Sequence, residues 1–190
     1  DVCNQMAIPV EGFHEETGPG QLELALQVME TSTAADNAAL YNSFAKVLAQ
    51  KQTRMVSFMA KWHPDHSGQG GHVHVSLQRL DGSTVFYDES KPNRISDEMR
   101  WFVGGLQTLA RDYMARHAPN INSYRRLVPG YWAPTSALWG VDNRTTAIRA
   151  ITGSPKSQRI EYRVPGADCK PNLVAESIFA AGLYGIEHKI

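Results

Sequence analysis

The chain has 190 residues, 42% of them hydrophobic, with 19 basic and 19 acidic side chains. A chain of this size and composition suits one domain with one core, and its balanced charge argues against a nucleic-acid or anionic-membrane surface, which needs a basic excess. Cys3 and Cys169 lie far apart and lack the Cys-x-x-Cys spacing of zinc and redox sites. No apolar run reaches the roughly 20 residues that span a bilayer, and no secretory signal pattern opens the chain. We therefore expect a cytoplasmic protein with no nucleic-acid or membrane partner.

The first predicted elements are two short strands. Residues 21–26 begin with alternating polar and apolar side chains, which is typical of a strand with one solvated face. A Gly-Pro-Gly turn at residues 18–20 precedes this segment. It places Glu15 and Glu23 on either side of a tight turn, where the two carboxylates either converge on a metal ion or point into solvent.

A helix, a short strand and a loop follow. Thr33 is predicted to cap a helix that ends near residue 52, because Ala, Leu and Phe recur at helical spacing without proline. Residues 55–59 are predicted to form a short apolar strand. The loop 62–71 is rich in turn formers, so His63 and His66 within it either pair on a metal ion or remain solvated.

The segment 71–77 is predicted to be a strand with one polar face. Strand alternation places His72, His74 and Ser76 on this face and three apolar side chains on the other. Neutral imidazoles bind borderline divalent metals, and added carboxylates shift the preference toward harder ions such as Mg²⁺ or Mn²⁺. The strand therefore offers ligands for a metal site, provided that carboxylates lie nearby.

A hairpin and two more helices are predicted around these strands. An Asp-Gly turn after the strand 71–77 predicts a hairpin that ends near residue 87. Ser96 suits the N-cap of a helix that continues to about residue 117. Pro171 suits the first turn of an apolar helix that ends near residue 188, whose small residues indicate close packing.

The stretch 122–163 concentrates positive charge. It contains six arginines against only two carboxylates, in a chain without net charge. In the predicted strand 159–163, alternation places Arg159, Glu161 and Arg163 on one face. A half-exposed strand with surface ion pairs gives the same pattern. The clustered arginines beside a glutamate instead favour a polyanionic ligand that is held together with a metal ion.

Six segments occur in a fixed order along the chain: GPGQLE, GHVHVSL, NSYRRLVPGY, NRTTAIR, RIEYRVPG and PNLVAESIFAAGLYGIEHKI. Their order and spacing resemble the catalytic domain of the glutamine synthetase family over nearly the whole sequence. The resemblance implies an α+β fold in which a curved antiparallel sheet presents a polar active-site face and is backed by helices. It also implies ATP, two Mg²⁺ or Mn²⁺ ions, glutamate and an amine or ammonia as ligands, in a homo-oligomeric ring with shared active sites.

The family also has an amino-terminal domain, which residues 1–190 do not contain. The sequence begins at Asp1 without a methionine and ends inside a helical pattern. We therefore expect residues 1–190 to be the catalytic-domain portion of a longer chain.

The resemblance implies roles for individual residues. The positions that match metal ligands are Glu15, Glu23, His72 and Glu161. The positions that match ATP contacts are His74, Ser76 and Arg159. Those that match the glutamate site are Arg126, Arg163 and Gly68, and those that match the catalytic arginines on the transferred phosphoryl group are Arg144 and Arg149.

The chain departs from the family pattern at the amine site. Trp132 stands where ammonia-using members have a glutamate that binds ammonium and takes its proton, and an indole cannot act as that base. Ser67 replaces the usual asparagine beside the glutamate site, and Lys170 precedes Pro171 where asparagine is common. These changes resemble family members that join glutamate to organic amines. Trp132 is therefore expected to contact the amine, since an aromatic face can stack on an alkyl or cationic group.

Three functions remain open at this point. The first is an ATP-dependent ligase that activates glutamate as γ-glutamyl phosphate and amidates it with an organic amine. The second is an ordinary glutamine synthetase that uses ammonia, and the third is a homologue without catalytic activity. Kinship of fold does not separate these functions, because function resides in the site.

Overall fold

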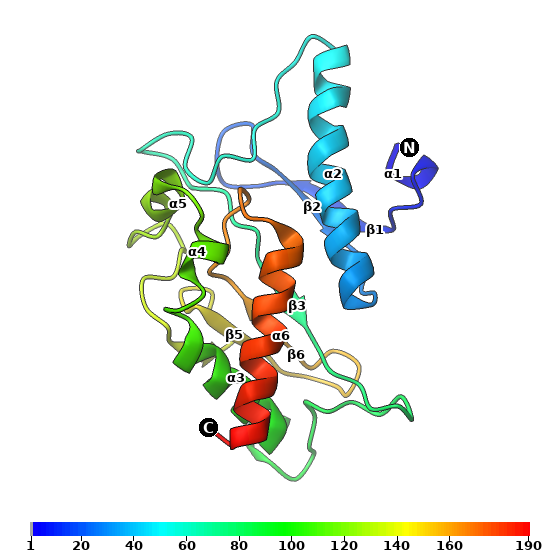
Figure 1. The fold of residues 1–190 in the computed structure, drawn as a ribbon, viewed down its shortest axis with the longest axis vertical. Helices are drawn as coiled ribbons and strands as arrows, with labels where there is room; N and C mark the ends of the chain where they lie inside the picture. The colour runs from blue at the N-terminus through cyan, green and yellow to red at the C-terminus, as the bar shows by residue number, and fades with distance from the viewer. Residues whose placement is uncertain (1) are drawn as a thin grey trace.

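The computed structural model describes residues 2–190. Figure 1 shows how its helices and strands are arranged. Their bounds are α1 Val2–Gln5, β1 Val10–Glu15, β2 Leu22–Leu26, α2 Thr31–Lys51, β3 Val73–Val75, η1 Pro92–Arg94, α3 Asp97–Leu109, α4 Met114–His117, α5 Ile121–Arg126, β4 Trp139–Val141, β5 Ile148–Ile151, β6 Arg159–Tyr162 and α6 Pro171–His188. Among the described residues, no helix has the length and apolar character needed to cross a membrane.

The strands form two separate sheets. β1 and β2 make an antiparallel hairpin, and the larger sheet has the order β3-β6-β5-β4. β6 is antiparallel to both of its neighbours, whereas β4 joins β5 in parallel. The predicted α+β class is confirmed. The parallel edge strand and the separate hairpin are features that the expectation of one antiparallel sheet did not include.

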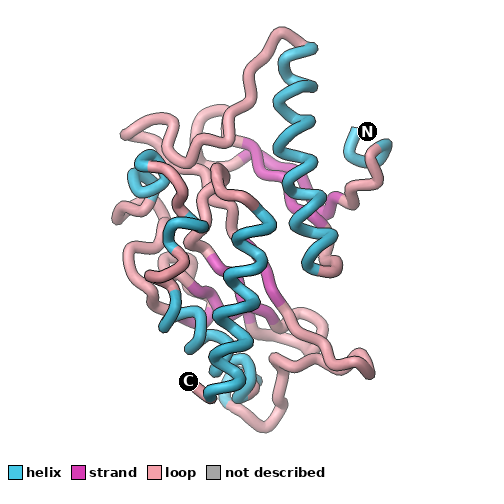
Figure 2. The backbone as a smooth tube through the Cα atoms, viewed as in Figure 1, coloured by secondary structure: helices cyan, strands magenta, loops and turns pink. Residues whose placement is uncertain are grey.

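The hydrophobic core lies between the larger sheet and the helices α3 and α6, which cover the same side of it (Figure 2). Ile160 and Tyr162 of β6 project into this core and are at most 1% exposed. The close approach of the two helices depends on glycine, because a Cβ added to Gly105 would lie 2.1 Å from a backbone oxygen of α6. A Cβ on Gly185 would lie 2.0 Å from the carbonyl of Trp101. The close packing indicated by the small residues of the last helix is confirmed.

Several predicted boundaries were wrong. The N-cap of α2 is Glu30, whose carboxylate accepts hydrogen bonds from the backbone amides of Ser32 and Thr33, so Thr33 lies inside the helix. Glutamate is an unusual N-cap, which explains why the sequence pointed to threonine. Residues 55–59 form no strand, and Met55 is 90% exposed, so these apolar side chains do not share the core.

The segments on either side of Ser96 also differ from the prediction. Ser96 caps α3 by accepting a hydrogen bond from the Met99 amide, as predicted. The helix ends at Leu109, however, and a turn separates it from the short helix α4. The hairpin predicted before it has only one isolated bridge, between Gln78 and Thr84.

His117 connects β6 and α6 at the back of the sheet. Its Nε2 lies 2.9 Å from the hydroxyl of Ser177, and its Nδ1 lies 3.3 Å from the hydroxyl of Tyr162. The residue is 1% exposed. Burial lowers the pKa of His117 to about 4, because an imidazolium would lose its hydration there.

This burial predicts a pH dependence of stability. The unfolded chain takes up a proton on His117 below its ordinary pKa of about 6.5, whereas the folded chain resists protonation until about pH 4. The free energy of unfolding should therefore fall by about 2 kcal/mol between pH 7 and 4.5 on account of this residue alone. Urea unfolding of the complete protein and of its His117→Gln variant at both pH values measures the effect. An equal pH dependence in the two proteins would contradict the prediction.

Candidate active site

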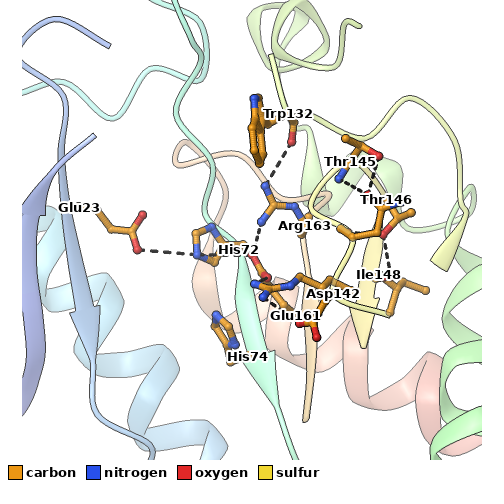
Figure 3. Close-up of polar contacts among 12 residues, drawn as sticks. Glu23, His72, His74, Trp132, Asp142, Thr145, Thr146, Ile148, Glu161 and Arg163 are labelled. Carbon is orange, nitrogen blue, oxygen red and sulfur yellow. Dashed lines mark hydrogen bonds and ion pairs between the residues drawn. The ribbon is translucent and has the colours of Figure 1, made fainter. Parts of the chain in front are cut away.

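The polar face of β6 is centred on Glu161, whose side chain is only 3% exposed. The strand register places Glu161 directly opposite His74 of β3 and Arg149 of β5, so the three side chains lie on one face. Its carboxylate accepts a hydrogen bond from Arg149 Nη1 at 3.0 Å and a second one from Arg163 Nη1. The shared polar face that strand alternation predicted is therefore present (Figure 3).

Electrostatics keep Glu161 ionised in this buried position. Burial by itself favours the neutral acid. The positive charge of Arg163, the neighbouring His72 and the hydrogen bond from Arg149 outweigh it and hold the pKa of Glu161 below its usual range. A buried carboxylate that stays charged is a suitable ligand for a divalent cation.

Two histidines and a second glutamate surround this carboxylate. His72, His74 and Glu161 each offer one ligand atom, and these atoms all lie within 4.8 Å of one another. Glu23 approaches from the separate β1–β2 hairpin, with its Oε1 3.8 Å from His72 Nε2 (Figure 3). Such a mixture of imidazole and carboxylate ligands fits a divalent metal of the Mg²⁺ or Mn²⁺ type better than a thiolate-preferring one.

Three arginines of the site have an unused hydrogen-bond donor. The Nε atoms of Arg126, Arg149 and Arg163 are buried and have no hydrogen-bond partner among residues 2–190. Buried donors without partners are costly, so this arrangement suits an anionic ligand that supplies acceptors. Arg149 also pairs with Asp142 at 3.0 Å. Although burial opposes it, hydrogen bonding to Glu161 and Asp142 raises the pKa of Arg149.

Arg126 lies at the end of α5 and is 6% exposed. Its Nη2 donates to the carbonyl of Val164 and, at 3.4 Å, to that of Arg163, which fixes it against the end of β6. Burial lowers the pKa of Arg126 to about 10, so it stays charged at neutral pH. Gly68 packs directly on this side chain, since an added Cβ would lie 2.5 Å from Arg126 Cγ. The loop of Gly68 thus packs against the aliphatic part of the Arg126 side chain.

Comparison with known proteins identifies the family of this domain. The family model described as "Glutamine synthetase, catalytic domain" matches residues 1–190. The chain belongs to this family.

Relatives with two kinds of name share the domain. The chain is 46% identical over 184 residues to type-1 glutamine synthetase 2 of Dictyostelium discoideum, which covers 96% of this chain and 35% of that protein. It is 41% identical over 183 residues to a glutamate–isopropylamine ligase of a Pseudomonas species, covering 96% of this chain and 40% of that protein. The cryo-EM structure of Plasmodium falciparum glutamine synthetase is similar with a TM-score of 0.91 and 29% identity, over 100% of this chain and 37% of that one. The chain thus spans less than half the length of these proteins.

Glu15 is less clearly placed than the other family metal positions. Glu15 is the last residue of β1 and lies opposite Leu22, whereas His14 lies opposite Glu23. Because side chains alternate along a strand, Glu15 lies on the opposite face of the hairpin from Glu23. In residues 2–190, a second group of potential ligands near the hairpin turn consists of His14, Glu16 and Glu23 and does not include Glu15. Metal ligation by Glu15, which the glutamine synthetase resemblance implies, stays a prediction.

Only some of the residues at the family positions for ATP and the phosphoryl group contact one another. Arg159 Nε donates to His74 Nδ1 at 3.0 Å. Desolvation of the ring, reinforced by neighbouring cations and opposed by Glu161, lowers the pKa of His74 to about 4, so the neutral ring can accept this bond. Ser76 and Arg144 are exposed, and Arg144 makes none of the ion pairs found among the described residues. Their roles stay predictions.

Trp132 lies beside the ionic cluster. Its carbonyl accepts a hydrogen bond from Arg163 Nη2 at 3.2 Å, while its side chain is 63% exposed. The backbone has a φ of 59°, a left-handed conformation that bulky residues rarely adopt. Such outliers persist where the surrounding structure imposes them, often at functional sites. The Trp132 backbone in this conformation contacts Arg163, a residue that the family resemblance assigns to glutamate binding.

The sequence interpretation did not include Asp168. Its Oδ2 accepts hydrogen bonds from Ser123 Oγ at 2.6 Å and Asn120 Nδ2 at 3.2 Å, and its buried Oδ1 has no partner within residues 2–190. An added Cβ on Gly166 would lie 2.5 Å from this Oδ1 and 3.7 Å from Arg126 Nε, so the carboxylate and the guanidinium face the same side of Gly166. Asp168 therefore supplies negative charge beside buried Arg126. The only sequence signal was an acidic residue shortly after the arginine-rich strand.

Proposed function

We propose that the protein containing this chain is an ATP-dependent carbon–nitrogen ligase that activates glutamate as γ-glutamyl phosphate and joins it to an organic amine. Membership of the glutamine synthetase family supports the reaction class. The observation that carries the choice of amine is Trp132, whose backbone carbonyl contacts Arg163 and whose side chain is uncharged where ammonia-using members have a carboxylate. The named function of the isopropylamine ligase relative agrees with it.

Two sets of residues on and around the polar face would bind the metal ions and ATP. Glu15, Glu23, His72 and Glu161 would hold Mg²⁺ or Mn²⁺, and His74, Ser76 and Arg159 would contact ATP. When bound, the divalent ions neutralise charge on the phosphates. The ionised, buried Glu161 supports this assignment, because Arg149 and Arg163 hold its carboxylate in place before any ion arrives.

The arginines perform two different tasks in this proposal. Arg126 and Arg163, with Gly68 packed on Arg126, would bind glutamate through its carboxylate groups. Arg144 and Arg149 would hold the phosphoryl group during transfer, where guanidinium groups stabilise the charge that spreads over the phosphoryl oxygens. The buried Nε donors of Arg126, Arg149 and Arg163 support a site built for anions.

The complete protein is proposed to act in the cytoplasm as a homo-oligomeric ring with shared active sites. The family's amino-terminal domain would then complete the site from a neighbouring subunit. The part of the relatives that this chain does not cover leaves room for such a domain, since the chain spans 35% of the Dictyostelium protein and 40% of the Pseudomonas protein.

An ordinary glutamine synthetase is the second candidate. The higher identity, 46%, to a relative named glutamine synthetase favours it. Under this alternative ammonia would be the nucleophile, and another group would take its proton in place of a carboxylate at position 132.

The identity of the amine tests the proposal. At neutral pH the nucleophile arrives mainly as a cation, so the site must attract it and remove a proton before it attacks the acyl phosphate. Tryptophan supports only the attraction, through its ring face, by about 0.5 to 2 kcal/mol. We therefore expect the complete protein to use an alkylamine or polyamine better than ammonium, and Trp132→Glu to shift the preference toward ammonium.

The measurement is kcat/KM by phosphate release for ammonium, methylamine, ethanolamine and putrescine, at fixed pH with saturating glutamate and MgATP. Trp132→Phe is the matched control, because it retains an aromatic face and adds no carboxylate. If the unmodified protein prefers ammonium over every organic amine, and Trp132→Glu does not raise kcat/KM for ammonium, ordinary glutamine synthesis replaces the proposal.

A further inference from the structure

A cleft of about 460 Å³ opens beside Trp132, between the loop that follows α5 and the turn that precedes β5. The apolar residues that line it include Trp132, Ala133 and Leu138, and the polar ones include Thr135, Ser136 and Asn143. The volume lies in the range of small-molecule sites. Of the residues that line the cleft, only Trp132 has a role in the function proposed above.

The cleft adjoins Arg163 through the backbone of Trp132. The Trp132 carbonyl accepts the hydrogen bond from Arg163 Nη2 at 3.2 Å, and Arg163 in turn pairs with Glu161. Figure 3 shows Trp132 above Arg163, with Thr145 and Thr146 to the right of it. A nucleophile that attacks glutamate held at Arg163 could therefore extend its remaining atoms into the cleft.

The opposite wall of the cleft is held by its own hydrogen bonds. Asn143 Oδ1 accepts from the amide and the hydroxyl of Thr145 at 2.9 and 2.7 Å. Thr146 Oγ1 lies 2.8 Å from the carbonyl oxygen of Asn143 and 3.0 Å from that of Ile148, and both oxygens can accept its proton. A wall fixed in this way is preorganised, which reduces the entropy lost when a ligand binds.

The side chains that line the cleft are uncharged. Within residues 2–190, no side chain that lines the cleft is charged. Asp142 precedes the lining residue Asn143, but its carboxylate already pairs with Arg149 at 3.0 Å. A second ammonium group placed in this cleft would lose water and would gain no counter-ion from residues 2–190, which is unfavourable. Alkyl groups would gain contact with the indole, and a hydroxyl could bond to the hydroxyl and amide groups of the polar lining residues.

We propose that this cleft binds the organic tail of the amine and selects short, uncharged tails, alkyl or hydroxyalkyl, over tails with a second positive charge. The inference rests on the proposed amine-ligase function and narrows its substrate class. It excludes diamines as preferred substrates, although such amines also present a primary amino group for the reaction.

The test compares two amines with the same four-carbon chain. Butylamine and putrescine differ at the far end, where putrescine carries a second ammonium group. In the complete protein, kcat/KM for butylamine should exceed that for putrescine by at least about tenfold. Ser136→Asp, which places a carboxylate in the cleft wall, should raise the putrescine-to-butylamine ratio by about tenfold or more. Ser43→Asp on α2, outside the cleft lining, adds the same charge and should leave the ratio unchanged.

Binding is also measured without turnover, by saturation-transfer NMR of each amine with the complete protein. No turnover of any amine, with butylamine binding that Ser136→Asp redirects to putrescine, would overturn the ligase function and support the cleft. Turnover of organic amines with a ratio that Ser136→Asp leaves within about twofold would overturn the cleft and support the ligase. A preference of the unmodified protein for putrescine, or the absence of butylamine binding, would also overturn the cleft assignment.

Discussion

Replacing Glu161 by glutamine in the complete protein should lower turnover by roughly 100-fold or more. Glutamine keeps the shape of the side chain but removes the charge that pairs with Arg149 and Arg163 and that would ligate a divalent ion. The same change leaves two adjacent guanidinium groups without their buried counter-ion. Stability should therefore also fall, by about 3 kcal/mol of unfolding free energy.

Asp142→Asn is the matched control for this prediction. Asp142 pairs with the same arginine at 3.0 Å, but its side chain is 55% exposed. Its loss should cost less than about 1 kcal/mol of stability and should change turnover little. Phosphate release at saturating substrates and urea unfolding measure both effects. Turnover of Glu161→Gln within about threefold of the unmodified protein would show that this carboxylate does not serve the reaction.

The polar face could be predicted from sequence because its period is local. In β6 every second residue is charged, and a strand must place these side chains on one face while Ile160 and Tyr162 enter the core. The same rule oriented His72 and His74. The long helix α6 and the Ser96 cap of α3 were also predictable, since propensity and capping act within a few residues.

The remaining features depend on contacts between distant segments. Glu23 reaches His72 from a separate sheet, and no spacing in the chain specifies how that hairpin is oriented. Asp168 is significant only because folding places it beside Arg126. The parallel pairing of β4 was likewise not visible, because two strands joined by a short connection are normally antiparallel. The roles of the individual residues came from the family resemblance.

Replacing Arg126 by alanine should raise the KM for glutamate by roughly 30-fold and should change the KM for ATP much less. The guanidinium is buried, is fixed by two backbone carbonyls, and has an Nε donor without a partner among residues 2–190. A contact to the carboxylate of bound glutamate exists before the reaction begins, so its loss appears mainly in apparent binding.

Arg144→Ala provides the contrast, because a group that contacts only the developing phosphoryl charge affects turnover. It should lower kcat by about 100-fold and leave the KM for glutamate nearly unchanged. Arg126→Lys separates loss of contact from loss of folding, since it keeps the charge and most of the volume but lacks the planar fork. Initial rates of phosphate release over a grid of glutamate and ATP concentrations distinguish the cases. Effects of less than a few-fold in both Arg126→Ala and Arg144→Ala would show that neither arginine faces the ligands, and the glutamate and phosphoryl sites would then have to be sought elsewhere on the polar face.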